Sequence, residues 1–361
     1  MVFFENQLLS KMLFVYTLNK VNLKTPSFTM NRFSLFTLGV VLACISISTS
    51  IIQAQKNGKE IVRPASYSPL TLADSRDLQS ILSQSVNEVV SSGNFKPEEL
   101  AATLIDLRDP ANLKWANING DRNIYPASVV KMFYMAALER QLEDKKVTLT
   151  KELERGLHDM IVDSSNEATQ YILDVLTDTS SGAELPQKEF EAWQYKRNRV
   201  NRFYSSLGYE NINVNQKTFC EDAYGIEQQS RAYKGQNRNM LTTNAVARLL
   251  SEIALRRMVT PERSEAMLAL MKRDPSKKTA DNDDQSTGFT GKAIIDGKLE
   301  GVSLWSKAGW TSKSRHDAAY IETSDGLKFV LVIFTENHAN DREPIPAIAA
   351  KVIKRLREQR S

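Results

Sequence analysis

The chain has 361 residues, of which 47 are basic and 43 are acidic, and its apolar content is 42%. These values are ordinary for a folded globular protein, and they exclude both a multi-span membrane protein and a disordered chain. Most of the formal net charge of +4 comes from residues 1–54. The rest of the chain is therefore nearly neutral and has no general electrostatic attraction for nucleic acid.

Histidine and cysteine usage argues against a metal or a dinucleotide cofactor. The three histidines, His158, His316 and His338, lack the spacing of a histidine-based zinc site, and no Gly-x-Gly-x-x-Gly motif follows a predicted strand. Of the two cysteines, Cys44 lies inside an apolar run, so Cys220 is the only thiol of the body and has no internal disulfide partner. We expect neither a metal nor a cofactor.

The N-terminal region predicts export. Residues 1–29 read as an upstream extension, and residues 30–54 read as a signal peptide with a basic start, an apolar stretch and the small residue Ala54 before the cleavage point. The alternative is a retained membrane anchor, because the apolar stretch is just long enough to span a bilayer. In both cases we expect the body to work in the periplasm or outside the cell, with membrane contact only if the segment is retained.

Apolar periodicity divides the body into two sheet-forming ends and a helical middle. After a polar linker at 55–73, we expect a helix that ends at Gly93 and then strands at 100–107 and 113–118. Helices are expected from 128 to about 256, with a polar interruption at 209–240. Strands at 289–305, 315–323 and 327–335 and a helix at 346–359 complete the body. This order predicts an α/β (α+β) fold: an antiparallel sheet flanked by helices, formed by 74–127 and 262–361, with an all-helical domain, 128–261, inserted into it.

Three short motifs suggest chemistry, and the first is Ser128-Val129-Val130-Lys131. Residues three apart share a face of a helix, so Lys131 Nζ can approach the Ser128 hydroxyl, and a desolvated lysine can remove its proton. Ser128 is expected to open the helix, where the positive end of the dipole favours a developing oxyanion. About one Ser-x-x-Lys match is expected by chance in a chain of this length, so the motif needs support.

The other two motifs are Ser164–Asn166, between two predicted helices, and Lys307–Trp310, on a predicted strand. The serine of the first can pass a proton to a leaving nitrogen and its asparagine can bind a carbonyl, although simple helix capping explains the same residues. The lysine of the other can hold a carboxylate, and Gly309 lets a ligand approach the backbone. The alternative there is an edge-strand lysine beside a bulge.

Taken in this order, on a helix, an interhelical loop and a late strand, the motifs resemble the signatures of the penicillin-recognising serine enzymes, specifically the class A β-lactamase-like family. The segments YPASVVKMFYMAALE, HDMIVDSSNEATQYIL, NMLTTNAVARLLSEI and WSKAGWTSKSRHDAAYIE also resemble that family. The resemblance covers about residues 75–360. It implies a β-lactamase/transpeptidase-like fold, a small β-lactam or peptidoglycan-like substrate, and no cofactor. We expect a monomer.

The resemblance also implies roles for the acyl-transfer residues. Ser128 matches the acylated nucleophile and Lys131 the lysine that activates it. Ser164 matches the serine that shuttles a proton, and Asn166 matches the asparagine that binds the side-chain amide of the substrate.

Further roles implied by the resemblance concern substrate binding. Lys307 matches the strand lysine that attracts the substrate carboxylate, and the glycine of this strand motif, Gly309, gives the ligand access to the backbone. The backbone N–H groups of Ser128 and Trp310 match the oxyanion hole. Arg315 resembles an arginine that helps to hold the carboxylate, and the alternative is an ordinary surface arginine.

The sequence departs from the family pattern at several positions. Ser165 replaces the Asp of the Ser-Asp-Asn motif, and Ala308 replaces the Thr or Ser after the strand lysine. No clean Glu-x-x-Leu-Asn segment, whose glutamate activates the deacylating water in the family, is present. Glu221 is the nearest candidate for this glutamate and Glu227 is the competing one. For each of them, an ordinary solvated acid of the loop is the favoured interpretation.

Three functions remain open. The leading prediction is a β-lactamase-like serine hydrolase that acylates Ser128 with a β-lactam or related amide and then hydrolyses the acyl-enzyme. The first alternative is a D,D-peptidase-like acyltransferase that traps β-lactams. The other is a non-catalytic envelope binding module of the same fold. A competent deacylating carboxylate within 209–230 would separate the first function from the others.

Overall fold

The computed structural model describes residues 58–92 and 95–359, and its centre is a seven-stranded sheet with the strand order β1-β3-β2-β7-β6-β5-β4. The strands are β1 (Ala73–Asp74), β2 (Leu100–Asp106), β3 (Lys114–Ile118), β4 (Lys272–Arg273), β5 (Val302–Trp310), β6 (Ser314–Thr323) and β7 (Lys328–Glu336). Neighbouring strands are antiparallel, except that β1 pairs with β3 in parallel. The predicted antiparallel sheet is therefore confirmed.

The central strands β2 and β7 are buried along almost their whole length. Both faces of these strands are covered, which explains why their sequences, LAATLI and FVLVIFT, are almost entirely apolar and lack a polar residue at every second position.

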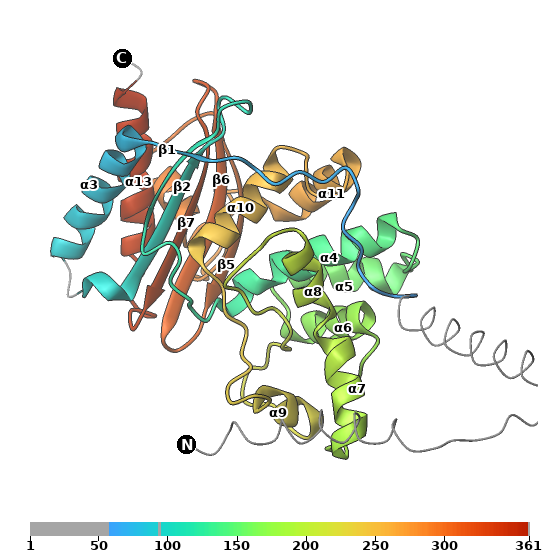
Figure 1. The fold of residues 1–361 in the computed structure, drawn as a ribbon. Helices are drawn as coiled ribbons and strands as arrows, with labels where there is room; N and C mark the ends of the chain where they lie inside the picture. The colour runs from blue at the N-terminus through green and yellow to red at the C-terminus, as the bar shows by residue number, and fades with distance from the viewer. Residues whose placement is uncertain (1–57, 93–94, 360–361) are drawn as a thin grey trace, which may run out of the picture. The chain divides into compact units, whose positions relative to one another are not determined.

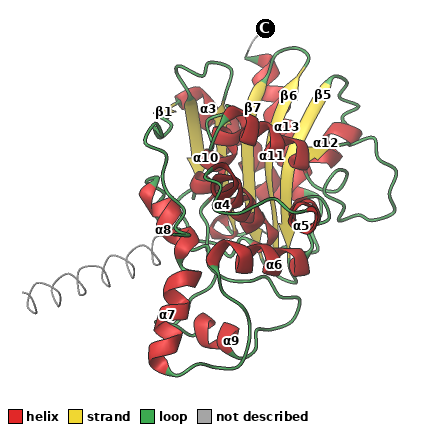
Figure 2. Cartoon of the chain, turned by 90° about the vertical axis from the view of Figure 1, so that its right-hand side faces the viewer, coloured by secondary structure: helices red, strands yellow, loops and turns green. Residues whose placement is uncertain are grey.

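Helices cover both faces of the sheet (Figure 2). The helices α3 (Arg76–Ser92), α12 (Thr290–Asp296) and α13 (Pro344–Glu358) lie on one face and share an apolar cluster with it. On the other face, α10 (Thr243–Ala254) packs against β2, β6 and β7, and α11 (Pro261–Met271) packs against β5.

The remaining helices are α4 (Lys131–Glu143), α5 (Lys151–Ile161), α6 (Asn166–Thr177), α7 (Gln187–Arg197), α8 (Arg199–Ser206) and α9 (Ile226–Arg231), with the 3-10 helices η1 (Pro97–Glu99) and η2 (Ala127–Val130). Helix α4 is buried along nearly its whole length and packs against α5, α6, α8 and α11, so it forms the centre of the helical region. Helices α7 and α9 extend away from the sheet (Figures 1 and 2).

The expectation of one strand over 289–305 is wrong. Residues 290–296 form α12, and β5 begins only at Val302 and continues to Trp310. A short apolar run such as Ala293–Ile295 fits a strand and a buried helix equally well by periodicity. The tertiary structure favours the helix, because the buried Asp317 carboxylate accepts a hydrogen bond of 3.0 Å from the backbone N–H of Thr290, at the helix start.

The segment from residue 58 to β1, which falls within the expected linker, packs against the helical region (the blue chain in Figure 1). Ile61 and Tyr67 are buried in the same apolar cluster as α4. The Tyr67 hydroxyl donates to Glu252 of α10 at 2.7 Å, and Glu60 forms an ion pair of 2.6 Å with Arg202 of α8.

The predicted signal peptide and upstream extension lie outside the described residues. Gly58–Ser361 forms one compact unit. Within 58–92 and 95–359, no helix is both long and apolar enough to cross a membrane. The division of the body into a sheet domain and an inserted helical domain stays a prediction.

Candidate active site

Ser128 lies on η2, the single turn that leads directly into α4. The residue before it, Ala127, has φ +47°, a left-handed conformation that costs a non-glycine residue free energy and that clusters at functional sites. Strand β5 approaches this turn very closely. A Cβ atom at Gly309 would lie 2.8 Å from the Ser128 nitrogen and 2.9 Å from the Pro126 oxygen, so this position of the strand accepts only glycine.

Lys131, the first residue of α4, is completely buried and its ammonium group faces the loop between α5 and α6. It donates hydrogen bonds to Ser164 Oγ at 3.2 Å, to the Ser164 backbone oxygen at 2.5 Å and to Asn166 Oδ1 at 3.0 Å. Burial lowers the pKa of Lys131 from 10.5 to about 7, and the charges of Glu167 and Cys220 oppose this shift only in part. A substantial fraction of this lysine is therefore neutral at neutral pH and can act as a base.

In the loop between α5 and α6, one residue caps the following helix and two others contact Lys131. Ser165 is the N-cap of α6, and its hydroxyl accepts a hydrogen bond of 3.0 Å from the backbone N–H of Ala168. The side chains of Ser164 and Asn166 are therefore free to contact Lys131. Serine and aspartate are both favoured N-cap residues, which explains physically why Ser165 can stand where the family pattern has Asp. Ser164 itself has φ +59°.

Lys307, on β5, reaches the same serine from the sheet. Its ammonium group is fully buried and donates to Ser164 Oγ at 2.9 Å and to the Ala308 oxygen at 3.0 Å. Burial lowers the pKa of Lys307 well below its usual value, and the nearby charges of Lys131 and Arg273 lower it further. The structure thus brings Lys131, Ser164, Asn166 and Lys307 into one hydrogen-bonded group beside the Ser128 turn.

Gln285 belongs to this group, and the sequence analysis missed it. Its side-chain oxygen accepts hydrogen bonds from Lys307 Nζ at 2.5 Å and from the Ala308 backbone N–H at 3.2 Å. Its amide nitrogen donates to the backbone oxygen of Val162 at 2.9 Å. Gln285 therefore ties β5 to the end of α5. It lies in a polar loop, where no local pattern distinguishes it from a solvated glutamine.

The two remaining predicted binding residues lie next to each other across β5 and β6. Trp310 is 39% exposed at the end of β5 and pairs in register with Arg315. Arg315 is buried, stacks on the Phe289 ring at 3.9 Å and forms an ion pair of 2.7 Å with Asp283, which also binds Arg342. Arg315 is thus not an ordinary surface arginine, and a carboxylate already opposes its charge.

The two glutamates considered for deacylation have different surroundings. Glu221 is exposed and makes no hydrogen bond or ion pair with any residue of the described chain. Glu227 is buried in an ion-pair cluster, where its carboxylate binds Arg197 at 2.6 and 2.8 Å and Lys217 at 3.4 Å. These charges lower the pKa of Glu227 despite its burial, so this carboxylate is held as an ion-pair partner.

In the loop between α8 and α9, which carries Glu221, the residue that contacts the candidate site is Cys220. The Asn166 side-chain amide approaches its sulfur at 3.4 Å, and the Gln170 side chain holds the loop by donating to the Thr218 backbone oxygen at 3.0 Å. Cys220 also interacts electrostatically with Lys131. Within this loop, the residue that contacts Asn166 is therefore a cysteine and not a glutamate.

One group of described side chains has the spacing needed for a metal ion. His158, Asp159 and Asp163 bring their ligand atoms within 4.8 Å of one another at the end of α5. His158 and Asp163 are exposed, and Asp159 is paired with Arg155 at 3.2 Å, so the group has the character of a solvated acidic surface. The absence of a resident metal stays a prediction.

Comparisons with solved structures identify the same fold in known enzymes. A β-lactamase from Sphaerobacter thermophilus is 20% identical, with a TM-score of 0.54 over 78% of this chain and 97% of that one. PBP-A is 18% identical, with a TM-score of 0.53 over 81% of this chain and 100% of that one. A β-lactamase from Chitinophaga pinensis is 16% identical, with a TM-score of 0.52 over 78% and 99%.

A search of curated proteins found no match. The model of the "Beta-lactamase enzyme family", however, matches residues 81–356, which include η2, the loop between α5 and α6, and β5. The matched range is well over half of the chain. The chain therefore belongs to the β-lactamase enzyme family.

Proposed function

We propose that this protein is a serine enzyme that forms an acyl-enzyme at Ser128 with a β-lactam or a related amide, and that it hydrolyses this acyl-enzyme slowly. The observation that carries the proposal is the buried Lys131, whose pKa is lowered to about 7 and whose nitrogen is hydrogen-bonded to Ser164 beside the Ser128 turn. A buried, partly neutral lysine is a suitable general base for a serine hydroxyl.

The acylation step follows from this arrangement. Neutral Lys131 takes the Ser128 hydroxyl proton while Ser128 Oγ forms a bond to the acyl carbonyl carbon. The carbonyl oxygen becomes an oxyanion at the start of the η2–α4 helix, where backbone N–H groups stabilise it. The C–N bond then breaks, and the nitrogen receives a proton from Ser164, which regains one from the ammonium groups that donate to it.

The substrate class follows from the charges around Ser164. Lys131, Lys307 and Arg273 are three buried basic groups of this region, and those of them that are protonated attract an anionic substrate group. Carboxylate-bearing amides, such as β-lactams or the peptide stem of a peptidoglycan-like substrate, have the matching charge. We therefore expect neutral acyl esters to be poorer substrates.

The proposal that the acyl-enzyme is hydrolysed slowly rests on the loop that contacts Asn166. Hydrolysis of the ester needs a water that a base deprotonates beside the acyl carbonyl. The loop presents Cys220 there, while Glu221 points to solvent without a partner in the described chain and Glu227 is neutralised by Arg197. This arrangement supports a D,D-peptidase-like, β-lactam-trapping behaviour. A mutant of PBP-A, 17% identical with a TM-score of 0.54, was solved as an acyl-enzyme complex with penicillin G.

Rapid β-lactamase turnover is the second candidate, and membership of the β-lactamase enzyme family favours it. In that case Glu221 is the nearest carboxylate that can serve as the base, provided that the loop turns it inward. A purely binding role is the weakest candidate, because Ser128, Lys131, Ser164, Asn166 and Lys307 are all present.

Time-resolved mass spectrometry of the intact protein with penicillin G tests the proposal and separates these candidates. We expect a covalent adduct that forms within minutes and persists for hours. An adduct that forms and disappears would indicate β-lactamase turnover, and the absence of any adduct would contradict the proposal. Export stays part of the proposal, and N-terminal sequencing of the mature protein from cell fractions tests it.

A further inference from the structure

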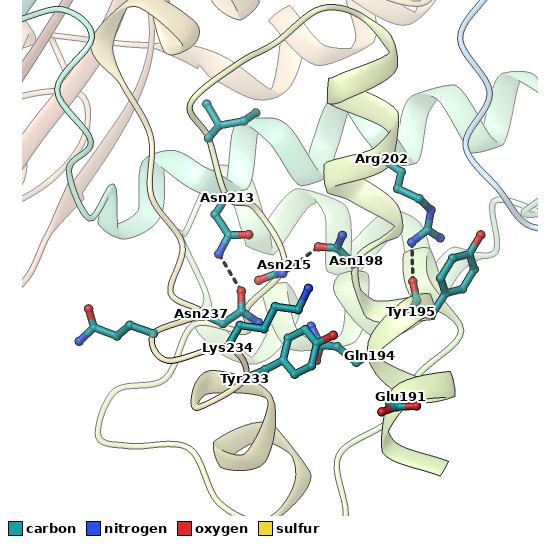
Figure 3. Close-up of a pocket in the computed structure, with 12 residues that line it drawn as sticks. Glu191, Gln194, Tyr195, Asn198, Arg202, Asn213, Asn215, Tyr233, Lys234 and Asn237 are labelled. Carbon is teal, nitrogen blue, oxygen red and sulfur yellow. Dashed lines mark hydrogen bonds between the residues drawn. The ribbon is translucent and has the colours of Figure 1, made fainter. Parts of the chain in front are cut away.

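A cavity of about 730 Å³ lies in the helical region, outside the candidate active site (Figure 3). Its walls are formed by α7, α8, the segment 212–215 and the segment 233–237 that follows α9. None of its lining residues is one of the predicted catalytic or substrate-binding residues. Its volume is within the range of roughly 300–1,000 Å³ that is typical of small-molecule sites.

Carboxamide side chains dominate the lining of this cavity. Six of its twelve lining residues are amides, namely Gln194, Asn198, Asn213, Asn215, Gln236 and Asn237. Each side-chain amide offers both a hydrogen-bond donor and an acceptor without a net charge. Such a lining suits a ligand that itself carries many neutral donors and acceptors.

The charged residues of the lining balance one another. Arg202 is paired with Glu60 at 2.6 Å, and Lys234 and Glu191 carry opposite charges. The cavity therefore has no excess of positive charge that would select a phosphate or another anion, and no excess of negative charge that would select a cation. Its chemistry points to an uncharged ligand.

Hydrogen bonds between these amides hold the walls of the cavity in place and leave an amide N–H group without an acceptor. Asn213 donates to Asn237 at 2.8 Å and Asn215 donates to Asn198 at 3.0 Å, so the two lining segments are held to each other and to the end of α7 (Figure 3). Gln194 is only 4% exposed. Its side-chain oxygen accepts from Ser230 at 2.7 Å, whereas its amide nitrogen has no acceptor among the described residues. Gln194 is one of the residues that line the cavity.

Two tyrosines add flat apolar surface to this polar frame. Tyr233 follows α9 and packs its ring edge-on against Phe190 at 5.7 Å. Tyr195 of α7 is 49% exposed, with Arg202 over one face of its ring at 3.9 Å, and Lys234 Nζ lies 5.4 Å from the centre of the Tyr233 ring. Each ring can therefore offer a ligand only the side that its cation leaves uncovered. Aromatic rings combine an apolar face with a polar hydroxyl, which matches the apolar C–H face and polar rim of a sugar ring.

From this combination we infer that the cavity is a saccharide-binding site, and that it takes an uncharged oligosaccharide bearing acetamido groups. The tyrosine rings contact the sugar faces, and the side-chain amides pair with the hydroxyl and acetamido groups. The unused amide nitrogen of Gln194 donates to a carbonyl or hydroxyl oxygen of the ligand. This site is separate from Ser128, so it does not depend on the proposed acyl transfer.

Titration calorimetry of the full chain with N,N′,N″-triacetylchitotriose tests the inference, with maltotriose as a probe that lacks acetamido groups. We expect saturable binding of triacetylchitotriose that is at least about tenfold tighter than that of maltotriose. Tyr233→Ala and Tyr195→Ala should each weaken binding by about tenfold, as expected for the loss of an aromatic contact. Tyr224→Ala is the matched control, because Tyr224 is 77% exposed and does not line the cavity.

Two further measurements keep the outcome decisive. Ser128→Ala should bind triacetylchitotriose as the unmodified protein does, whatever its effect on acylation, so failure of one proposal does not imply failure of the other. Circular dichroism checks that each variant is folded, and the exposed position of Tyr195 makes Tyr195→Ala the safer variant. Absence of saturable binding to either sugar, equal affinity for both, or binding that survives both tyrosine substitutions would overturn the inference.

Discussion

Lys131 and Lys307 donate to the same oxygen, the Ser164 hydroxyl, at 3.2 and 2.9 Å. One lysine comes from the first turn of α4 and the other from β5, so this hydroxyl joins the helical region to the sheet. Burial lowers the pKa of both lysines, and the charge of Lys131 lowers the pKa of Lys307 further. Ser164 thus lies between two groups that can give or take a proton.

The first prediction is the pH dependence of acylation. Lys131 is an active base only when it is neutral, and it becomes neutral as the pH rises through its pKa of about 7. The acylation rate constant should therefore increase between about pH 6 and pH 8 and then level off. Stopped-flow measurements with a chromogenic cephalosporin from pH 5.5 to 9 would show this curve. Lys131→Arg should acylate at least about 100-fold more slowly, and a flat profile in the unmodified protein would exclude Lys131 as the base.

The second prediction concerns Gln285 as a positioning residue. Gln285→Leu removes the acceptor of Lys307 Nζ and the donor to the Val162 backbone, so Lys307 should lose its fixed position. We expect acylation by a carboxylate-bearing substrate to fall about 10- to 100-fold, as when outer groups that orient a functional residue are removed. The free energy of unfolding should fall by about 1–3 kcal/mol, because polar groups become unpaired.

Gln216→Leu is the matched control for this variant. Gln216 is also buried and hydrogen-bonded, but its side chain binds Asn215 and Ser230, away from Lys307. This variant should lose similar stability and keep its acylation rate and its pH profile. Equal loss of activity in the two variants would mean that Gln285 has only a structural role.

The third prediction is an acid-sensitive stability that arises from His316. Its Nδ1 accepts a hydrogen bond from the Thr335 backbone N–H at 3.2 Å, so Nε2 carries the proton and donates to the Tyr125 oxygen at 2.9 Å. Burial lowers the pKa of His316 from 6.5 to about 4, because the charged ring is poorly solvated there. Protonation of Nδ1 would also remove the hydrogen bond that it accepts from Thr335. The stability is complete above about pH 6.5 and should decrease by about 3 kcal/mol as the pH falls to 4.

Urea unfolding at pH 7, 5.5 and 4.5 measures this loss, with His158→Gln as a control at an exposed histidine. The control should follow the same pH dependence as the unmodified protein. His316→Asn should be less stable at pH 7 and less sensitive to pH between 6.5 and 4. An unchanged slope in His316→Asn would assign the acid sensitivity to other groups.

The sequence could predict the elements and residues that local patterns define. Periodicity predicts the strands at 315–323 and 327–335 and the helix after Ser128, and the structure confirms them. Gln285 and Asp283 could not be predicted, because their importance arises from contacts with distant residues of β5 and β6. The same holds for the loop between α8 and α9. The sequence pattern does not show whether residue 220 or residue 221 contacts the site, and only the fold brings Cys220 to Asn166.

The fourth prediction tests this loop. Cys220→Glu would introduce a carboxylate at the position that contacts Asn166, where it can accept a proton from water beside the acyl group. We expect the adduct with penicillin G to disappear at least about tenfold faster than in the unmodified protein. Glu221→Gln should leave the adduct lifetime unchanged, because Glu221, unlike Cys220, makes no contact with Asn166 in the described chain.

Cys220→Ser is the control for loss of the thiol alone, and it should keep a long-lived adduct. Chase experiments that follow the intact mass after removal of free penicillin give the lifetimes. If Glu221→Gln lengthens the lifetime while Cys220→Glu does not shorten it, the deacylating group is Glu221 and the protein is a β-lactamase with turnover.

Acylation of Ser128 is the central claim, and peptide mapping by tandem mass spectrometry after incubation with penicillin G tests it most directly. We predict that the mass of the intact penicillin is found on the peptide that contains Ser128 and on the serine itself, and that Ser128→Ala carries no adduct although it remains folded. The claim would be contradicted by an adduct on another residue, by an adduct that persists in Ser128→Ala, or by an unmodified Ser128 after hours of incubation.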